Sequence, residues 1–426
     1  MTIIQHSTTQ AGSSAARRLS GGASLFLLAS IVVSFLAASS AATPLYAVYQ
    51  SEWAFSPVTT TVVFGVYAIA VLVALLTVGR LSDHIGRRPV LLAALAVQAV
   101  TMLIFIDAGG VTALVVARVI QGLATGAAVG AVGAALIDVD RARGTLLNSV
   151  APPFGTAAGA ILSGVLVQFL PAPTTLVFAV LLIVFALQTA GLLVMAETVT
   201  RKPGALASMR PEVTLPRHLR RPVLVAIPVL VAAWSLAGLY GSVGPALVAR
   251  LVGHSSFVLG GLGLFTLAAG GALAVLVLRN APATRVMVAG IGALLVGVLG
   301  TMTSIAMGSV TGFFLGTAIA GLGFGAGFQG SIRTVVPLAA AHERAGVLSV
   351  LYTVSYVAMG TPAVVAGLLV VHGGGLVPTA LEYGAGVMVL ALVALVGLAG
   401  SRRTSTTAAA IACTSSTKGT PCPART

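Results

Sequence analysis

Charged side chains are scarce in this sequence. Asp, Glu, Lys and Arg make up 8% of its 426 residues, whereas a soluble domain usually contains about a quarter. Hydrophobic residues account for 58%, and they occur in runs of about twenty, the length that a helix needs to cross the hydrocarbon core of a bilayer. The composition excludes an ordinary soluble domain and indicates an integral membrane protein in a lipid bilayer.

Residues that build enzyme sites are also few. The six histidines fall in predicted loops or tails without metal-ligand spacing, so we expect no metal, no cofactor and no enzyme activity. The glycine-rich "GLGFGAG" lies inside an apolar run without a preceding strand or a phosphate-binding lysine, which argues against a nucleotide site. Cys413 and Cys422 both lie in the polar C-terminal segment, where we expect free thiols.

The apolar runs predict an all-α membrane protein with twelve transmembrane helices. The predicted spans are residues 24–46, 59–78, 89–106, 111–137, 147–170, 174–196, 223–248, 257–278, 286–307, 310–337, 347–371 and 377–400. The first run follows Arg17 and Arg18, as the apolar region of a secretory signal does, but it is longer than such a region. We therefore interpret it as a retained first helix.

The few charges are distributed unevenly along the chain. The formal net charge is +14. If twelve helices place both termini on one side of the membrane, every Lys and Arg except Arg118 and Arg250 lies in a segment on that side. The positive-inside rule makes that side the cytoplasm. Because topology accounts for the positive charge, we expect no nucleic-acid partner.

The longest polar interruption, a basic stretch with prolines, divides the chain into two halves. The predicted organisation is a cytoplasmic tail at 1–22, a six-helix bundle at 23–196, a cytoplasmic linker at 197–222, a second six-helix bundle at 223–400 and a disordered cytoplasmic tail at 401–426. At an offset of 201 residues, Gly122 and Gly126 align with Gly323 and Gly327, and Arg143 aligns with Arg344. This similarity favours two pseudo-symmetric bundles built on a repeated unit.

One polar loop resembles a family signature. The stretch "GRLSDHIGRR", Gly79 to Arg88, resembles the loop between the second and third helices of the major facilitator superfamily of secondary transporters. The resemblance extends over essentially all twelve predicted helices and is to the bacterial twelve-helix type. It implies two six-helix bundles that move a small-molecule substrate by alternating access without a cofactor. The sequence leaves the oligomeric state open, and we favour a monomer.

The resemblance also implies a conformational latch at this loop. In the family, the residues that match Asp83 and Arg87 form cytoplasmic contacts that hold the outward-open state, with an acid at the inner end of the fourth helix as partner. We prefer Asp138 to Asp140 for that acid, and Arg88 is the further basic residue. Gly79 allows close packing, and Gly86 allows a tight turn. The alternative is that the arginines serve only topology.

A charged residue is also expected inside the membrane. The stretch "ARVIQGLATGAAVGA" resembles the fourth-helix motif of the same family, whose arginine, here Arg118, is associated with proton coupling or structural hydrogen bonding. A central arginine costs roughly 2.5–3.5 kcal/mol on insertion scales, so it normally faces a cavity or a partner. Snorkelling to the outer surface is the alternative. Gln121 and Glu382 are the other candidates for coupling or for the cavity.

Glycines and scattered aromatic and amide side chains complete the candidate sites. We expect close helix packing at Gly122, Gly126, Gly155 and Gly159. Candidates for a substrate cavity, with ordinary helix packing as the alternative, are Tyr46, Trp234, Tyr240, Gln329, Tyr352 and Tyr356. The scarcity of acids in the predicted core favours neutral or anionic amphiphiles as substrates.

The direction of transport rests on a weak motif. The stretch "FGTAAGAILSG" loosely resembles an exporter motif, although Thr156 stands where that motif has proline. We predict a proton-coupled exporter of small drugs or metabolites in the bacterial inner membrane. The alternatives are a proton-linked importer of a small organic solute, and a membrane sensor or assembly factor that transports nothing.

Overall fold

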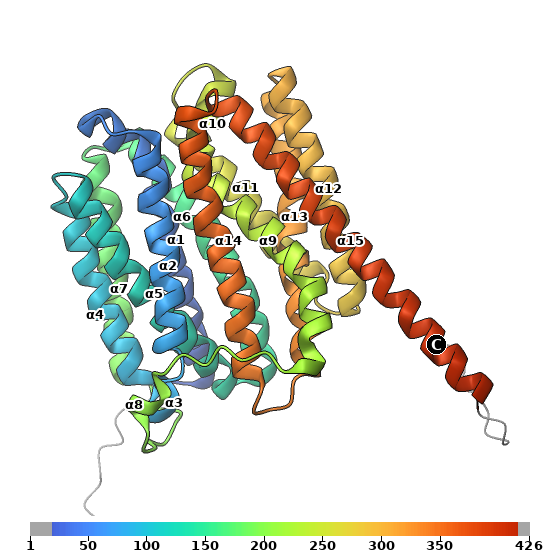
Figure 1. The fold of residues 1–426 in the computed structure, drawn as a ribbon. Coiled ribbons are helices and arrows are strands. Elements are labelled where there is room, and N and C mark those ends of the chain that lie inside the picture. The colour runs from blue at the N-terminus through green and yellow to red at the C-terminus, as the bar shows by residue number, and fades with distance from the viewer. Residues whose placement is uncertain (1–18, 416–426) are drawn as a thin grey trace, which may run out of the picture.

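The structure is a computed structural model that describes the backbone of residues 19–415 and the side chains up to residue 400. All regular elements in this part of the chain are helices. Twelve helices are long and apolar enough to cross a membrane, and Figure 1 shows them standing side by side. The predicted all-α fold with twelve membrane helices is confirmed.

Six of these helices form the N half. They are α1 (Gly21–Trp53), α2 (Pro57–Thr77), α4 (Arg87–Ile106), α5 (Val111–Val139), α6 (Arg141–Phe169) and α7 (Pro173–Val194), with the short α3 (Ser82–Ile85) before α4. The first helix runs further than its predicted span, as far as Trp53, because Pro44 lies inside it without ending it.

The other six spans form the C half. They are built from α9 (Arg220–Ser242) with α10 (Gly244–Val252), α11 (Phe257–Val277), α12 (Ala283–Met307), α13 (Val310–Val335), α14 (Arg344–His372) and α15 (Leu376–Ser415), with short helices α8 (Ala205–Ser208), η1 (Arg217–Leu219) and η2 (Val336–Leu338) outside them. The predicted seventh span is broken at Val243, just before Pro245. Gly308, with φ of 66°, separates α12 from α13.

Each half has its own hydrophobic core. One main cluster of buried apolar side chains comes from α1 to α7. The other comes from the C half and takes in only Ala160 from α6 among its buried members. In Figure 1 the two bundles accordingly appear as a blue-to-green group and a yellow-to-red group.

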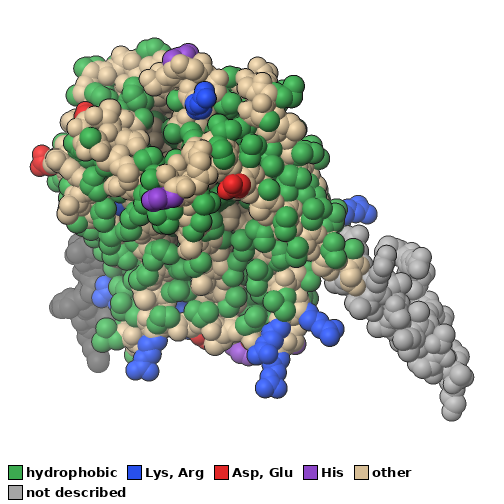
Figure 2. Space-filling model, turned by 45° about the horizontal axis from the view of Figure 1, so that its top comes forward, with side chains coloured by type: hydrophobic (Ala, Val, Ile, Leu, Met, Phe, Trp, Pro, Cys, Tyr) green, Lys and Arg blue, Asp and Glu red, His purple; other side chains and the backbone are tan. Residues whose placement is uncertain are grey.

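The two ends of the bundles differ in charge. The loop 79–88, the linker 197–222 and the loop 339–344 lie at one end, which we call the basic end; the other is the opposite end (Figure 1). Figure 2 shows Lys and Arg gathered along the lower edge of the molecule, below a belt of hydrophobic side chains. The belt is the surface that matches the hydrocarbon core.

The halves touch through small residues toward the opposite end. A Cβ on Gly261 of α11 would lie 2.3 Å from the Ala160 carbonyl oxygen of α6, and one on Gly65 of α2 would lie 2.9 Å from Val364 of α14. The Thr43 hydroxyl donates to the carbonyl oxygen of Gly241 at 3.1 Å. These contacts close the seam at the opposite end.

The four glycines expected to pack helices all lie at close contacts. A Cβ on Gly122 or Gly126 would meet α2, at 2.6 and 2.5 Å, and one on Gly155 or Gly159 would meet backbone oxygens of α1, at 2.5 and 2.1 Å. The repeat needs a correction, because the glycines of α13 that meet α11, as Gly122 and Gly126 meet α2, are Gly321 and Gly325. They lie two residues before the positions given by the fixed offset.

The predicted tails need partial correction. Helix α15 continues to Ser415, so the segment from residue 401 to 415 is helical in its backbone where the sequence predicted disorder. Helix α1 begins at Gly21, within the predicted N-terminal tail. The rest of both predicted tails, residues 1–18 and 416–426, and the cysteine side chains lie outside what the structure describes.

Candidate functional site

The loop between α2 and α4 is shaped by its two glycines. A Cβ on Gly130 of α5 would lie 3.3 Å from the Gly79 Cα atom, so α5 and this loop nearly touch. Gly86 has φ of 105°, in a region that favours glycine, and it separates α3 from α4. The sharp change of direction aims Arg87 and Asp83 toward each other at the start of α4.

Arg87 is the centre of a polar cluster at the basic end. Its guanidinium pairs with Asp83, and its Nε donates to Asp138 Oδ2 at 3.0 Å. Its Nη1 also donates to Ser82 Oγ at 2.8 Å. The Arg87 side chain is 8% exposed, against 31% for Asp138, so the pair is partly shielded from water. The structure thus brings together the residues expected to form the latch.

The neighbouring charged residues take other roles. The Arg88 guanidinium donates to the Leu193 carbonyl oxygen at the end of α7. Asp140 caps α6, where its Oδ1 accepts hydrogen bonds from the backbone N–H groups of Ala142 and Arg143 at 3.0 and 2.9 Å. Of the two acids considered for the latch, Asp138 is therefore the one that contacts Arg87.

Sequence reasoning missed Glu197 in this cluster. Its carboxylate accepts hydrogen bonds from the backbone N–H groups of Arg87 and Arg88 at 2.9 and 3.0 Å, and so caps α4. A Cβ on Gly86 would lie 2.6 Å from Glu197 Oε2. The available signal was only an acid at the start of the linker, with no motif to connect it to the loop.

The linker continues along the same loop and then reaches the C half. Arg80 pairs with Glu212, and the Lys202 backbone N–H donates to the His84 carbonyl oxygen at 2.9 Å. Further on, His218 Nε2 lies 3.5 Å from a carboxylate oxygen of Glu343. The contacts of the Arg87 side chain stay within the N half, so it is the linker that connects this loop to the other bundle.

The C-half loop between α11 and α12, which corresponds to residues 79–88 of the N half, is held by different contacts. This loop lacks an acid, and Arg333 of α13 donates instead to the carbonyl oxygens of Leu278 and Ala281, at 3.2 and 2.7 Å. The arginine thereby holds the turn after α11, where the Leu278 carbonyl oxygen also accepts a hydrogen bond from the Ala281 N–H at 3.1 Å. The polar cluster around Arg87 has no counterpart of the same chemistry here among the described residues.

Arg118 lies fully buried in the N half, with 0% of its surface exposed. Its Nε donates to the Tyr46 hydroxyl at 2.9 Å, and its Nη1 donates to the Ser39 carbonyl oxygen and to Gln121 Oε1, at 2.9 and 2.7 Å. Its guanidinium carbon lies 5.0 Å from the centre of the Tyr67 ring. The side chain points inward rather than snorkelling.

Neutral groups are the partners of this buried charge. Among the described residues, the contacts of Arg118 are hydroxyl, amide, carbonyl and aromatic groups, and no carboxylate pairs with it. Hydrogen bonds and ring faces lower the cost of burying a cation but leave its charge uncompensated. Tyr67 is a member of this site that sequence reasoning missed.

An aromatic cluster lies on the C-half side of the seam. The Trp234 ring centre is 5.0 Å from that of Tyr356, 5.4 Å from that of Phe328 and 6.2 Å from that of Phe324. The cluster packs against Phe64 of α2, one turn from Tyr67. Trp234 Nε1 is buried without a hydrogen-bond partner among the described residues, so a donor remains free here.

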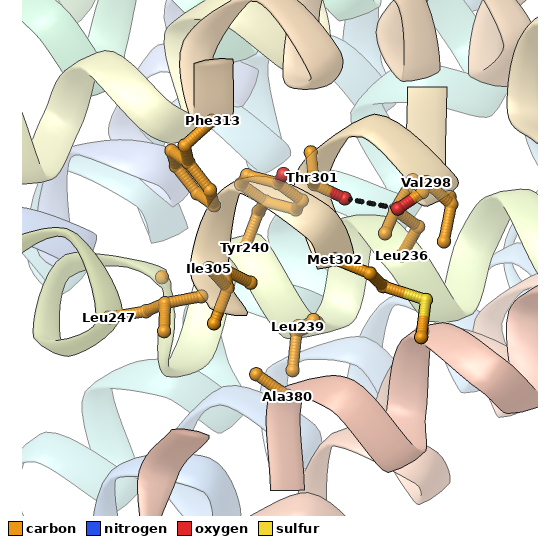
Figure 3. Close-up of a pocket in the computed structure, with 12 residues that line it drawn as sticks. Leu236, Leu239, Tyr240, Leu247, Val298, Thr301, Met302, Ile305, Phe313 and Ala380 are labelled. Atoms are coloured by element: carbon orange, nitrogen blue, oxygen red, sulfur yellow. Dashed lines mark hydrogen bonds between the residues drawn. The ribbon is translucent and has the colours of Figure 1, made fainter. Parts of the chain in front are cut away.

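Two predicted residues lie elsewhere. The Tyr240 hydroxyl bonds with Thr317 Oγ1 at 2.6 Å inside the C half, and its ring lines a cavity of only about 20 Å³ beside Phe313 and Leu247 (Figure 3). Glu382 of α15 is exposed on the outside of its bundle. Tyr240 therefore belongs to the interior of the C half and Glu382 to its exposed surface.

The remaining predicted cavity residues are half-buried in the C half. Tyr352 lies one turn from Tyr356 on α14, toward the basic end. Gln329 follows Phe328 on α13, and its Oε1 is buried without a partner among the described residues. Both helices belong to the bundle that supplies the aromatic cluster.

Comparison with known proteins identifies the family. The model of the Major Facilitator Superfamily matches residues 27–363. The chain belongs to the major facilitator superfamily. The match covers most of both halves of this major facilitator transporter, and the family resemblance drawn from the loop 79–88 is confirmed. As a family member the protein is a secondary transporter and not an enzyme, and it crosses the membrane with twelve helices.

A solved structure supports the same fold. The human organic anion transporter MFSD10 (TETRAN) matches with a TM-score of 0.60 at 15% sequence identity, covering 89% of this chain and 99% of that one. At this identity the likeness concerns the fold alone. The arrangement of two six-helix bundles is therefore the family's arrangement.

Proposed function

We propose that this transporter is a proton-coupled exporter of small drugs or metabolites, and that its substrates are neutral or anionic amphiphiles. The observation that carries the proposal is Arg118, a buried cation whose described partners are all neutral. It lies beside Tyr67 on α2, and the same helix packs against the aromatic cluster around Trp234.

Arg118 and the aromatic cluster around Trp234 suit the two parts of an anionic amphiphile. A buried guanidinium without a carboxylate attracts an anionic group and repels a cation. Across the seam, aromatic rings offer apolar faces to the rest of an amphiphile, and the free Trp234 N–H offers one hydrogen bond. Tyr46 and Gln121 orient Arg118, and we propose that Arg118 and Gln121 serve coupling or line the cavity, with Tyr46 as a cavity residue.

Orientation and latch belong to the same proposal. We place the basic end in the cytoplasm of a bacterial inner membrane, because Lys and Arg are concentrated there, and we propose that the protein works as a monomer. The linker 197–222 is then cytoplasmic. Asp83, Arg87 and Asp138 act as the latch of the cycle, supported by the contacts among them, which lie within the N half and are made here with the seam closed at the opposite end.

Flux measurements test the proposal. The purified protein is reconstituted in vesicles with an imposed pH gradient and offered a panel of amphiphiles; organic anions belong on it because the structural neighbour is named for them. We expect a flux that collapses when a protonophore removes the gradient. Movement in exchange for protons supports an exporter, and movement together with protons supports the importer. A flux indifferent to the gradient contradicts proton coupling.

Variants of Arg118 test the substrate class. Arg118→Gln removes the charge, so anion transport should fall by at least about tenfold, a loss of about 1.4 kcal/mol, while neutral substrates lose less. Arg118→Lys keeps the charge but loses the planar fork that bonds Tyr46 and Gln121, and should retain part of the anion flux. Equal losses for anions and neutral compounds would contradict the proposed role.

A further inference from the structure

Two helices from different halves meet at the opposite end of the molecule. The last turn of α6, from the N half, lies against the first turn of α11, from the C half. A Cβ on Gly164 would lie 2.7 Å from the Phe257 carbonyl oxygen, so the two backbones approach closely at this point. This close contact fixes the register of the α6 end relative to the α11 end.

Gln168 uses this register to cap a helix of the other half. Its Oε1 accepts hydrogen bonds from Ser256 Oγ at 2.9 Å and from the Val258 backbone N–H at 3.1 Å. Ser256 is the N-cap residue of α11, and its Oγ accepts a bond from the Leu259 N–H at 3.3 Å. Gln168 therefore completes a cap that α11 supplies only in part.

We propose that Gln168 is a positioning residue of the transport cycle: its amide oxygen caps α11 across the seam and stabilises the state that is closed at the opposite end. The bonds exist only while α6 and α11 touch, and they must break each time the seam opens there. Because Gln168 is exposed, water replaces the lost partners after opening. The cap therefore biases the equilibrium modestly, as a cycling transporter requires.

The proposal predicts the sign of charge substitutions. The N-terminus of a helix carries a partial positive charge, and a side-chain charge there changes stability by about 0.3–1 kcal/mol, which is about a two- to fivefold change in an equilibrium constant. Gln168→Glu should favour the closed opposite end by this factor, and Gln168→Lys should disfavour it. Gln168→Met, similar in length but without an acceptor, should also disfavour it.

Distances between spin labels at the two ends measure this equilibrium without a substrate. In a Cys413→Ser, Cys422→Ser background, Asp107→Cys and His372→Cys report the opposite end. Ala142→Cys and Ala341→Cys report the basic end, and all four positions are exposed. In vesicles, Gln168→Glu should raise the population with a short distance at the opposite end and a long one at the basic end. Gln168→Lys and Gln168→Met should lower it.

The design separates capping from damage. Misfolding would move the two charged variants in the same direction, whereas capping moves them in opposite directions. Raising the salt concentration should shrink the effects of Glu and Lys, because an exposed charge is screened, and leave that of Met. Shifts of the same sign for Glu and Lys, or populations that match the unmodified chain in all three variants, would overturn the proposal.

Discussion

At the basic end, Arg87 forms an ion pair with Asp138 and not with the neighbouring Asp140. Two acids lie two positions apart, yet only Asp138 contacts the arginine, while Asp140 caps the next helix. Substitution by asparagine distinguishes the two roles, because asparagine caps helices as well as aspartate does but cannot form the ion pair that the latch requires.

Asparagine substitutions should therefore affect the two acids differently. We expect Asp138→Asn to slow turnover several-fold, in line with the loss of about 1 kcal/mol when a neutral acceptor replaces a charged one in a hydrogen bond. Asp140→Asn should transport at a rate close to that of the unmodified protein. Asp83→Asn should resemble Asp138→Asn and leave membrane insertion intact. Substrate flux at equal protein levels measures the difference, and equal rates for all three variants would remove the latch assignment.

Two structural constraints favour glycine at position 86. Its φ of 105° is strained for other residues, and its missing side chain leaves space for Glu197. Gly86→Ala should lower stability by about 1–3 kcal/mol, measured as a lower melting temperature in detergent. In a Glu197→Ala background the same change should cost less, because the steric part disappears. An equal cost in both backgrounds would show that the contact with Glu197 is unimportant.

At the scale of elements, α14 contains a proline that its neighbour accommodates. Pro362 has no N–H group to donate to the Ala358 carbonyl oxygen four residues earlier. Ser235 Oγ of α9 donates to that oxygen at 3.1 Å, and the Ser235 carbonyl oxygen in turn accepts from the Tyr383 hydroxyl of α15 at 2.8 Å. The hydrogen bond that is missing in α14 is thus replaced by one from α9, and α9 is bonded in turn to α15. We call these contacts the Ser235 joint.

Ser235→Ala should remove the hydrogen bond to the Ala358 carbonyl oxygen and lower the free energy of unfolding by about 1 kcal/mol. Ser242→Ala is the matched control: it lies on the same helix, both serines are 4% exposed, and the Ser242 hydroxyl bonds within its own helix to the Gly238 carbonyl oxygen at 2.7 Å. Thermal unfolding in detergent should show a larger shift for Ser235→Ala. Similar shifts would mean that the carbonyl freed by Pro362 does not need this donor.

At the scale of the whole molecule, the number and approximate place of the membrane helices could be predicted, because length and hydropathy are local properties of the chain. The contact of Arg87 with Asp138 was anticipated from the family motif. Glu197 lies 110 positions from Arg87, and Gln168 lies 88 positions from Ser256. Such pairs are set by how the helices pack, and no local pattern marks them. The same holds for Tyr240, whose side chain turns into its own bundle.

The proposed orientation makes a prediction for the whole chain. In the cysteine-free background, a membrane-impermeant thiol reagent added to intact cells should label His254→Cys, at the opposite end, and should label His342→Cys only after the membrane is broken. Both side chains are exposed. The reverse pattern would place the basic end outside and contradict the orientation drawn from the positive charge.

The different chemistry of the two loops at the basic end has a kinetic consequence. Arg333 fastens its loop through carbonyl oxygens and not through a carboxylate. Among the described residues at this end of the C half, Glu343 is paired with His218, and exposed arginines lie along the rim at Arg220, Arg221, Arg279, Arg285 and Arg344. Such a rim acts as an electrostatic funnel, which enriches anions at the mouth over roughly one Debye length, about 8 Å at physiological ionic strength. The encounter rate of an anion arriving from that side should therefore fall as salt is added, while that of a neutral solute should not.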